Sequence, residues 1–220
     1  MPKTKPHRRE EQRLRKLGHV HIAGADEAGK GAWAGPIVAG AVILAEDFDP
    51  KIINDSKVLT AKQRERMFVH IARNAISWAV GVVPSEEIDR DGIVAANRKA
   101  LELAVRRLHV PPHAVLVDAV PIVVNGTPVK AIIDGDAKCL SVAAASIVAK
   151  VARDTLMDGH HRVHPQYGFN VHKGYGTAAH EKALKKHGPS AIHRRSFAPM
   201  KPKQTVKKSK PTRSKKRRTS

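Results

Sequence analysis

The most informative stretch is His21-Ile-Ala-Gly-Ala-Asp-Glu-Ala-Gly-Lys-Gly31, an apolar run that ends in two adjacent acids and continues into a glycine-rich turn. Neighbouring residues on a strand point to opposite faces, so Asp26 and Glu27 together do not fit a simple pattern of inside and outside. Glycines that follow a strand let backbone N–H groups approach a ligand closely. The pattern suits a divalent cation beside a phosphate, and a solvated turn is the alternative that these residues alone leave open.

Charge is unevenly distributed along the 220 residues, whose net charge is +20. Residues 1–18 carry a net +5 and residues 201–220 a net +10, which leaves +5 for residues 19–200. Because such basic ends cannot bury apolar surface, we expect two disordered arms around one domain at 19–200. The tail at 201–220 is typical of a sequence-indifferent phosphate binder, and a solubilising tail or a nuclear-import signal would have a similar composition.

The cellular setting follows from what the chain lacks. The basic N-terminus leads into no apolar segment of signal-peptide length, and no apolar run is long enough to span a membrane. Cys139 is the only cysteine, which excludes an intrachain disulfide and fits a reducing compartment. We therefore expect a cytoplasmic protein without membrane association.

Hydrophobic periodicity predicts strands that alternate with helices after an initial run of strands. Thr60 is a plausible N-cap for an amphipathic helix that ends near residue 74, and Gly92 precedes a stronger helix. The pattern predicts an α/β fold with a mixed sheet. The expected strands are 20–26, 34–44, 76–83, 114–118 and 129–133, and the expected helices are 60–74, 93–108, 140–157 and 178–187.

Four acids end an apolar element or lie on a helix that is expected to be buried: Asp26, Glu27, Asp118 and Asp154. An unpaired carboxylate in such a place is costly. Asp118 closes an expected strand, at the rim where α/β sheets usually hold ligands, and Asp154 opposes the dipole near the end of its helix. Gathered together, four oxygen donors provide a ligand set for Mg²⁺ or Mn²⁺, although each acid taken singly is more often structural.

Several motifs, in order and with suitable spacing over residues 19–200, resemble those of ribonuclease HII, the bacterial type 2 ribonuclease H. They are Asp26-Glu-Ala-Gly-Lys-Gly-Ala-Trp-Ala-Gly-Pro36, Asn54-Asp-Ser-Lys57, Val117-Asp118, Gly135-Asp136, Ala143-Ala-Ala-Ser-Ile-Val-Ala-Lys-Val-Ala-Arg-Asp154, Tyr167-Gly-Phe169, His172-Lys-Gly-Tyr-Gly-Thr177 and Ile192-His-Arg-Arg-Ser-Phe-Ala-Pro199.

The resemblance implies an RNase H-like fold, with a five-stranded mixed sheet flanked by helices and a helical C-terminal extension. It implies a monomeric endoribonuclease that cuts the RNA strand of RNA/DNA hybrids and cuts 5′ of single ribonucleotides in duplex DNA. The products would carry 3′-hydroxyl and 5′-phosphate ends. The family's catalytic, metal-binding acids fall on Asp26, Glu27, Asp118 and Asp154, which would hold two Mn²⁺ or Mg²⁺ ions.

The resemblance also implies substrate-binding residues. The family's glycine–arginine–glycine element, which contacts the ribose 2′-OH largely through its backbone, falls on Gly29, Lys30 and Gly31. Lysine is tolerable there if the backbone makes the contacts, and is a weaker substitute if a guanidinium grips a phosphate. Tyr175 matches a tyrosine that stacks on the sugar beside the ribonucleotide, and Lys57 matches a residue that touches the backbone near the cut.

Two other functions remain open. A non-catalytic nucleic-acid-binding protein would bind with strong salt dependence and would not cut. An RNase H-like nuclease for another structured substrate would cut without regard to the 2′-OH. The histidines between residues 160 and 180 show no structural-zinc spacing, and we expect them near nucleic acid or solvent.

Overall fold

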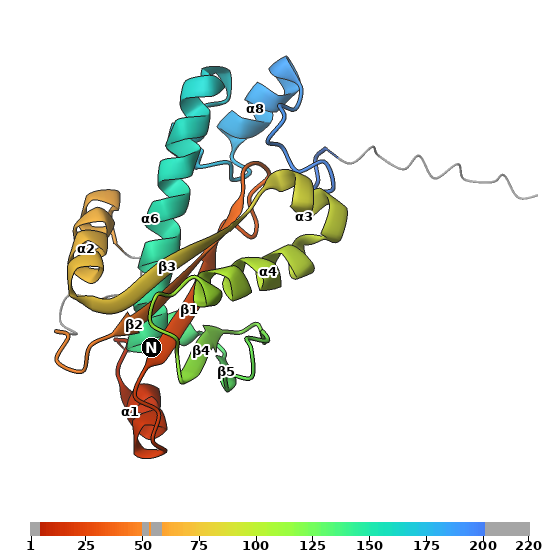
Figure 1. Ribbon diagram of the computed structural model, residues 1–220. Helices are drawn as coiled ribbons and strands as arrows, with labels where there is room; N and C mark the ends of the chain where they lie inside the picture. The colour runs from red at the N-terminus through yellow and green to blue at the C-terminus, as the bar shows by residue number, and fades with distance from the viewer. Residues whose placement is uncertain (1–4, 50–52, 54–58, 201–220) are drawn as a thin grey trace, which may run out of the picture.

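The fold is built on one five-stranded mixed sheet, as predicted, and its strand order is β3-β2-β1-β4-β5. The computed structural model describes residues 5–49, 53 and 59–200 (Figure 1). β1, the central strand, pairs antiparallel with β2 on one side and parallel with β4 on the other. The strands are β1 (Ile22–Ala28), β2 (Ile37–Leu44), β3 (Ala75–Val83), β4 (Ala114–Asp118) and β5 (Val129–Ile132).

One face of the sheet is covered by α6 (Leu140–Val163), with α2 (Ala61–Asn74) beside it (Figure 1). A Cβ atom at Gly24 would lie 2.1 Å from the Ser141 carbonyl carbon, and one at Gly40 would lie 2.4 Å from the Ala145 oxygen. The backbone of α6 therefore rests directly on β1 and β2, which requires glycine in the strands and small residues in the helix. The predicted cap of α2 is confirmed, because Thr60 and Gln63 form a capping box.

The other face of the sheet is covered by α4 (Ile93–Arg106), which follows the short α3 (Ser85–Asp91). Its buried positions include Ala96, Ala100, Leu101 and Ala104, at the helical spacing that the sequence shows. These side chains pack against β3, β2 and β1 and belong to the largest of the hydrophobic clusters among the described residues. The sheet is thus covered on both faces, as expected for an α/β layer.

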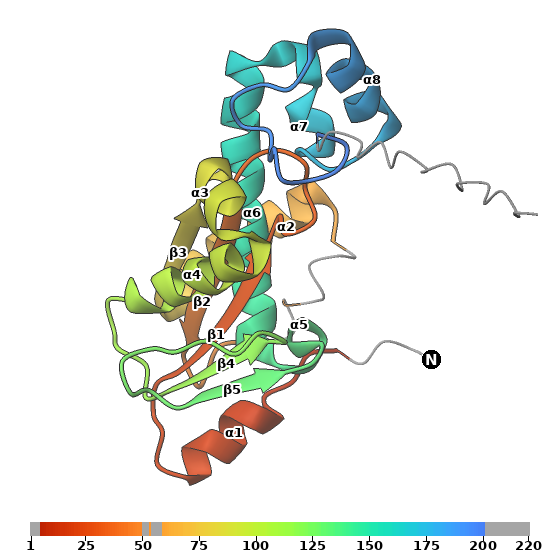
Figure 2. The same ribbon diagram turned by 90° about the vertical axis from the view of Figure 1, so that its right-hand side faces the viewer.

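The helical C-terminal part lies at the end of α6 that extends beyond the sheet (Figure 2). The sequence predicts that this helix ends near residue 157, but it continues to Val163, with Met157 buried against the segment that follows. The following elements are η2 (Pro165–Tyr167), α7 (Phe169–His172) and α8 (Ala178–His187). Among the described residues, no helix has both the length and the apolar content needed to cross a membrane.

The expectation of a disordered arm at residues 1–18 is wrong for residues 9–16, which form α1 (Arg9–Lys16). Glu11 is 5% exposed and accepts hydrogen bonds from the Ser141 amide (2.9 Å) and hydroxyl (2.8 Å). No side chain of α6 itself caps its N-terminus, so Glu11 caps it from a distant part of the sequence. The backbone of His7 also forms an isolated parallel β-bridge with that of Cys139, the residue between α5 (Gly135–Lys138) and α6. The charge pattern of residues 1–18 does not predict α1, because the helix is held by Glu11, whose partner Ser141 is 130 residues away in the sequence.

We expect Glu11→Ala to lower the free energy of unfolding by about 2 kcal/mol, because it leaves two buried donors of Ser141 without their acceptor. Glu10→Ala on the same helix removes only a surface ion pair with Lys130 and should cost less than about 1 kcal/mol. Urea unfolding of both variants measures the difference. Equal losses would contradict the capping role of Glu11.

Candidate active site

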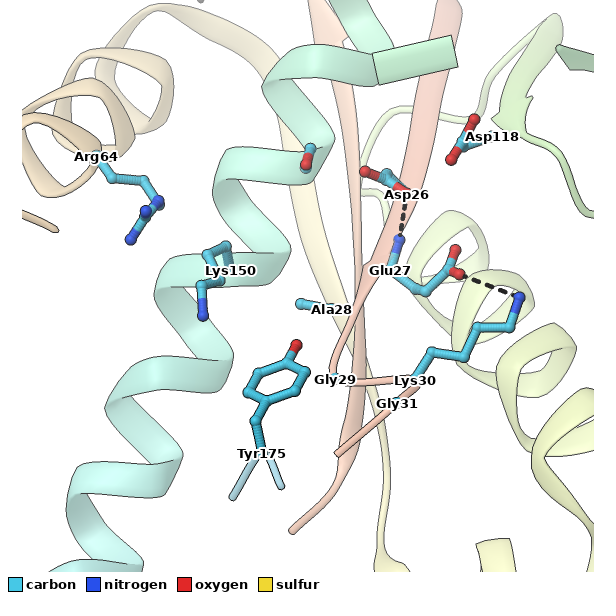
Figure 3. Close-up of a pocket in the computed structure, with 11 residues that line it drawn as sticks. Asp26, Glu27, Ala28, Gly29, Lys30, Gly31, Arg64, Asp118, Lys150 and Tyr175 are labelled. Carbon is cyan, nitrogen blue, oxygen red and sulfur yellow. Dashed lines mark hydrogen bonds and ion pairs between the residues drawn. The ribbon is translucent and has the colours of Figure 1, made fainter. Parts of the chain in front are cut away.

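A pocket of about 470 Å³ lies at the carboxyl ends of β1 and β4, between α6 and the turn after β1 (Figure 3). It gathers three of the predicted acids with the glycine turn, the predicted tyrosine and three cationic side chains. Its lining residues are Asp26, Glu27, Ala28, Gly29, Lys30, Gly31, Arg64, Asp118, Ser146, Lys150 and Tyr175.

Parallel pairing of β1 and β4 brings two of the acids to one edge. The register pairs Ala25 with Val117, so Asp26 and Asp118 follow at neighbouring strand ends. Asp26 is 5% exposed, and its Oδ1 accepts the Glu27 amide at 2.8 Å. The Gly135 amide donates to Asp118 Oδ1 at 2.7 Å and holds that carboxylate at the rim.

The electrostatics of these acids favour a bound cation. Burial, with the neighbouring charges of Glu27 and Asp118, raises the pKa of Asp26 well above its ordinary value. Burial also raises the pKa of Glu27, with Lys30 acting in the opposite direction. Glu27 Oε2 is buried and makes no hydrogen bond within the described part of the chain. A buried, orphaned carboxylate oxygen beside two more acids fits a hard divalent cation such as Mg²⁺ or Mn²⁺.

The carboxylates are not yet arranged as a closed ligand shell. No group of three or more His, Cys, Asp or Glu residues among those described is placed to hold a metal ion as it stands. Glu27 Oε1 instead lies 3.6 Å from Lys30 Nζ, and its side chain points toward that lysine (Figure 3). While Oε1 faces Lys30, Glu27 Oε2 is the oxygen left to face a cation.

Asp154, the fourth predicted acid, does not line this pocket. Its Oδ1 accepts from Lys150 Nζ at 2.7 Å, and its Oδ2 lies 3.7 Å from Arg64. Two helical turns separate it from Ser146, which displaces it by about 12 Å along α6. The sequence groups Asp154 with the other acids because it opposes the helix dipole and matches the family motif, and that grouping stays a prediction.

Asp136 is a buried acid that does not belong to the predicted four. It is 3% exposed, and it directly follows Gly135, whose amide binds Asp118. The sequence signal was an acid just before an Ala-rich helix, where a negative charge faces the positive end of the helix dipole. Asp136 thus lies next to the carboxyl end of β4, although, like Asp154, it does not itself line the pocket.

Two buried guanidinium groups hold the glycine turn in place. Arg153 and Arg194 are both fully buried. Arg153 donates to the carbonyls of Ala34, Pro36 and Lys173, and Arg194 donates to those of Lys30 and Gly35. The backbone of the turn is therefore fixed by α6 and by the segment after α8, whichever side chain residue 30 carries.

Gly29 and Gly31 are glycines for different reasons. Gly29 has a φ of +92°, and a Cβ there would lie 1.9 Å from Arg153 Nε, so the fold itself requires glycine. Gly31 has ordinary φ, and a Cβ there would meet nothing within 4 Å. Packing within the described structure does not require glycine at position 31. The missing side chain instead leaves the backbone there open to a partner that enters the pocket.

Tyr175 comes from the loop between α7 and α8 and points its ring into the pocket (Figure 3). Lys150 Nζ and the Arg153 guanidinium carbon lie 5.6 and 5.2 Å from the ring centroid. These cations fix the ring from the side of α6. The predicted substrate contact Lys57, with Asn54, lies outside the described residues.

The comparisons with known proteins identify the family. The family model described as Ribonuclease HII matches residues 23–200. The Ribonuclease HII of Roseiflexus castenholzii is 48% identical over 196 residues, which cover 87% of this chain and 88% of the relative. The solved ribonuclease H2 of Pyrococcus horikoshii is 27% identical, with a TM-score of 0.71 over 82% of this chain and 95% of that one.

A third protein, Bst-RNase HIII solved in complex with Mn²⁺, has a TM-score of 0.66 over 88% of this chain and 72% of that one, and at 22% identity it shows the fold alone. Fold and sequence define a metal-dependent ribonuclease, a phosphodiester hydrolase of the ribonuclease H type that acts on nucleic acid. The chain belongs to the ribonuclease HII family.

We expect Gly29→Ala to lower the free energy of unfolding by about 3 kcal/mol, through left-handed strain and the collision with Arg153. The matched variant Gly31→Ala should change it by less than about 0.5 kcal/mol. Chemical denaturation without metal compares the two. Equal stability of the two variants would show that the Arg153 contact does not constrain the turn.

A further prediction concerns the stability of Asp26→Asn without metal. The pKa of Asp26 is raised in the folded state. The free energy of unfolding therefore falls as the pH rises from 3.8 through that pKa, and the whole loss is present above it. Asparagine removes the charge and can still accept the Glu27 amide. Thermal unfolding at pH 8 in a chelator should give a higher Tm for the variant. A lower Tm would mean that the carboxylates do not repel one another.

Proposed function

We propose that this enzyme cuts the RNA strand of RNA/DNA hybrids and cuts 5′ of single ribonucleotides embedded in duplex DNA, and leaves 3′-hydroxyl and 5′-phosphate ends. One observation carries the proposal: buried and half-buried carboxylates meet at a pocket whose other wall is a rigid glycine turn that is open at Gly31. The first feature suits phosphodiester hydrolysis. The second suits recognition of a sugar hydroxyl.

Asp26, Glu27 and Asp118 would hold two Mn²⁺ or Mg²⁺ ions, and we propose Asp136 as the fourth acid in place of Asp154. Two such ions supply an activated water and stabilise the leaving oxygen. The residues of the chain orient that chemistry: the Gly135 amide fixes Asp118, and the Glu27 amide fixes Asp26. Asp154 instead supports Lys150 and Arg64, the cations that face an incoming phosphate.

Recognition of RNA would come from the backbone of Gly29, Lys30 and Gly31, which the buried arginines hold at the pocket wall. Because Arg194 binds the Lys30 carbonyl, lysine in place of the family's arginine leaves the backbone contacts intact. Tyr175 would stack on the sugar beside the ribonucleotide. Lys57 would touch the phosphate backbone near the cut.

The direct experiment incubates a duplex DNA that carries one ribonucleotide with the full chain and either Mg²⁺ or Mn²⁺. We expect a single nick 5′ to the ribonucleotide, an intact all-DNA duplex, and a loss of more than about a hundredfold in rate for Asp118→Asn. The exposed Asp134→Asn is the matched control and should cut normally. An intact duplex under both metals would favour the non-catalytic binder. Cleavage of the all-DNA duplex would favour a nuclease that ignores the 2′-OH.

The fourth acid is tested by comparing Asp136→Asn with Asp154→Asn. If Asp136 binds metal, its variant should lose more than about a hundredfold in cleavage rate, and Asp154→Asn should lose less than about tenfold. Mn²⁺ titration by calorimetry should show weakened binding only for Asp136→Asn. The opposite order would restore Asp154 to the site.

A further inference from the structure

Three histidines, His172, His180 and His193, form a buried cluster behind the Tyr175 loop. Their side chains are 9%, 0% and 1% exposed. The rings of His172 and His180 stack with centroids 4.4 Å apart, and His180 lies against Trp33 at 5.5 Å. The expectation that His172 and His180 lie near nucleic acid or solvent is therefore wrong, because both pack inside the C-terminal part.

Hydrogen-bond partners fix which nitrogen of each ring carries the proton. The Ser190 amide can only donate, and it lies 2.9 Å from His193 Nδ1, so that nitrogen is an acceptor. Neutral His193 therefore carries its proton on Nε2. That atom lies 3.0 Å from His180 Nε2, which must then accept.

The proton of His180 is consequently on Nδ1, which lies 2.9 Å from the Tyr175 carbonyl oxygen, an obligate acceptor. The chain of bonds runs in one direction, from the Ser190 amide through His193 and His180 to Tyr175. We call it the histidine relay. A second proton on His180 would place two N–H groups against each other, so the relay requires neutral rings.

His172 has the opposite assignment to its stacked neighbour. The Gly174 amide donates to its Nδ1 at 3.2 Å, and its Nε2 proton faces the Tyr167 carbonyl at 2.7 Å. Burial lowers the pKa of all three histidines, and lowers that of His193 to about 4. Neutral rings at pH 7 are consistent with the geometry.

The loop is already held before Tyr175, because Arg153 donates to the Lys173 carbonyl and the Trp33 and Ala34 amides donate to that of Gly174. Tyr175 itself lies between two glycines, Gly174 and Gly176, and so needs a further restraint. The main chain of Tyr175 otherwise bonds only within the loop, to His172 and Thr177. His180 is the contact that ties its carbonyl to α8.

We propose that the histidine relay positions Tyr175 at the pocket, which makes His180 and His193 positioning residues for the recognition of the ribonucleotide. This inference rests on the role proposed above for Tyr175. His180 and His193 would act only through the tyrosine, since neither lines the pocket.

The first test reads the tautomers directly, by long-range ¹H–¹⁵N correlation NMR on the full chain at pH 7. We expect His180 as the Nδ1–H tautomer, and His193 and His172 as the Nε2–H tautomers. An Nε2–H or doubly protonated His180 would overturn the relay. This measurement needs no substrate, so its outcome is independent of the proposed function.

The second test measures KM and kcat on the single-ribonucleotide duplex. His180→Phe keeps the aromatic packing and removes both hydrogen bonds, and we expect about a tenfold rise in KM. His187→Phe, on the exposed side of α8, is the control and should stay within about twofold. In a Tyr175→Ala background, His180→Phe should add less than about twofold, because its effect passes through the tyrosine.

A second pair of variants covers failure of His180→Phe to fold. His193→Gln retains a donor at the position of Nε2 and should keep KM within about threefold, and His193→Leu should raise it about tenfold. Equal effects of Gln and Leu would overturn the inference, as would additive effects of His180→Phe and Tyr175→Ala. If Tyr175→Ala leaves KM unchanged while the duplex is still cut, Tyr175 has no recognition role and the positioning claim falls, but the ribonuclease assignment stands.

Discussion

The site depends on the parallel pairing of β1 with β4, which places the Asp26 and Asp118 carboxylates at adjacent strand ends inside a covered sheet. Burial, and then the like charges of Glu27 and Asp118, make an ionised Asp26 costly for the folded chain and raise its pKa. A divalent cation reverses the sign of the interaction. The same residues that lower the stability of the fold would then bind the metal, a trade of stability for function that is common at active sites.

Rigid surroundings make this arrangement usable. The backbone of α6 rests directly on Gly24 and Gly40, so the helix that carries Ser146 and Lys150 cannot shift away from the acids. Arg153, from the same helix, reaches across to the carbonyls of the glycine turn and of the Tyr175 loop. One helix thus sets the positions of the acids, the turn and the tyrosine relative to one another. If these supports were loose, none of the three would be held in a defined position.

Much of this could be predicted from the sequence, because local patterns specify local structure. The apolar run before Asp26, the Thr60 cap and the helix after Gly92 all occur as predicted. The parts that the sequence does not reveal depend on distance in space. Glu11 is buried only because Ser141 lies beside it, and Asp154 lies outside the lining of the pocket because two helical turns of α6 separate it from Ser146. Neither fact can be predicted from the spacing of residues along the chain. The role of Lys57, which lies outside the described residues, stays a prediction.

A crystal structure of the full chain with Mn²⁺ and a noncleavable duplex that carries one ribonucleotide would test the central claim most directly. The account predicts metal density between Asp26, Glu27 and Asp118, and the ribose against Gly31. Metal bound elsewhere, or a ribose that lies away from Gly31, would contradict it.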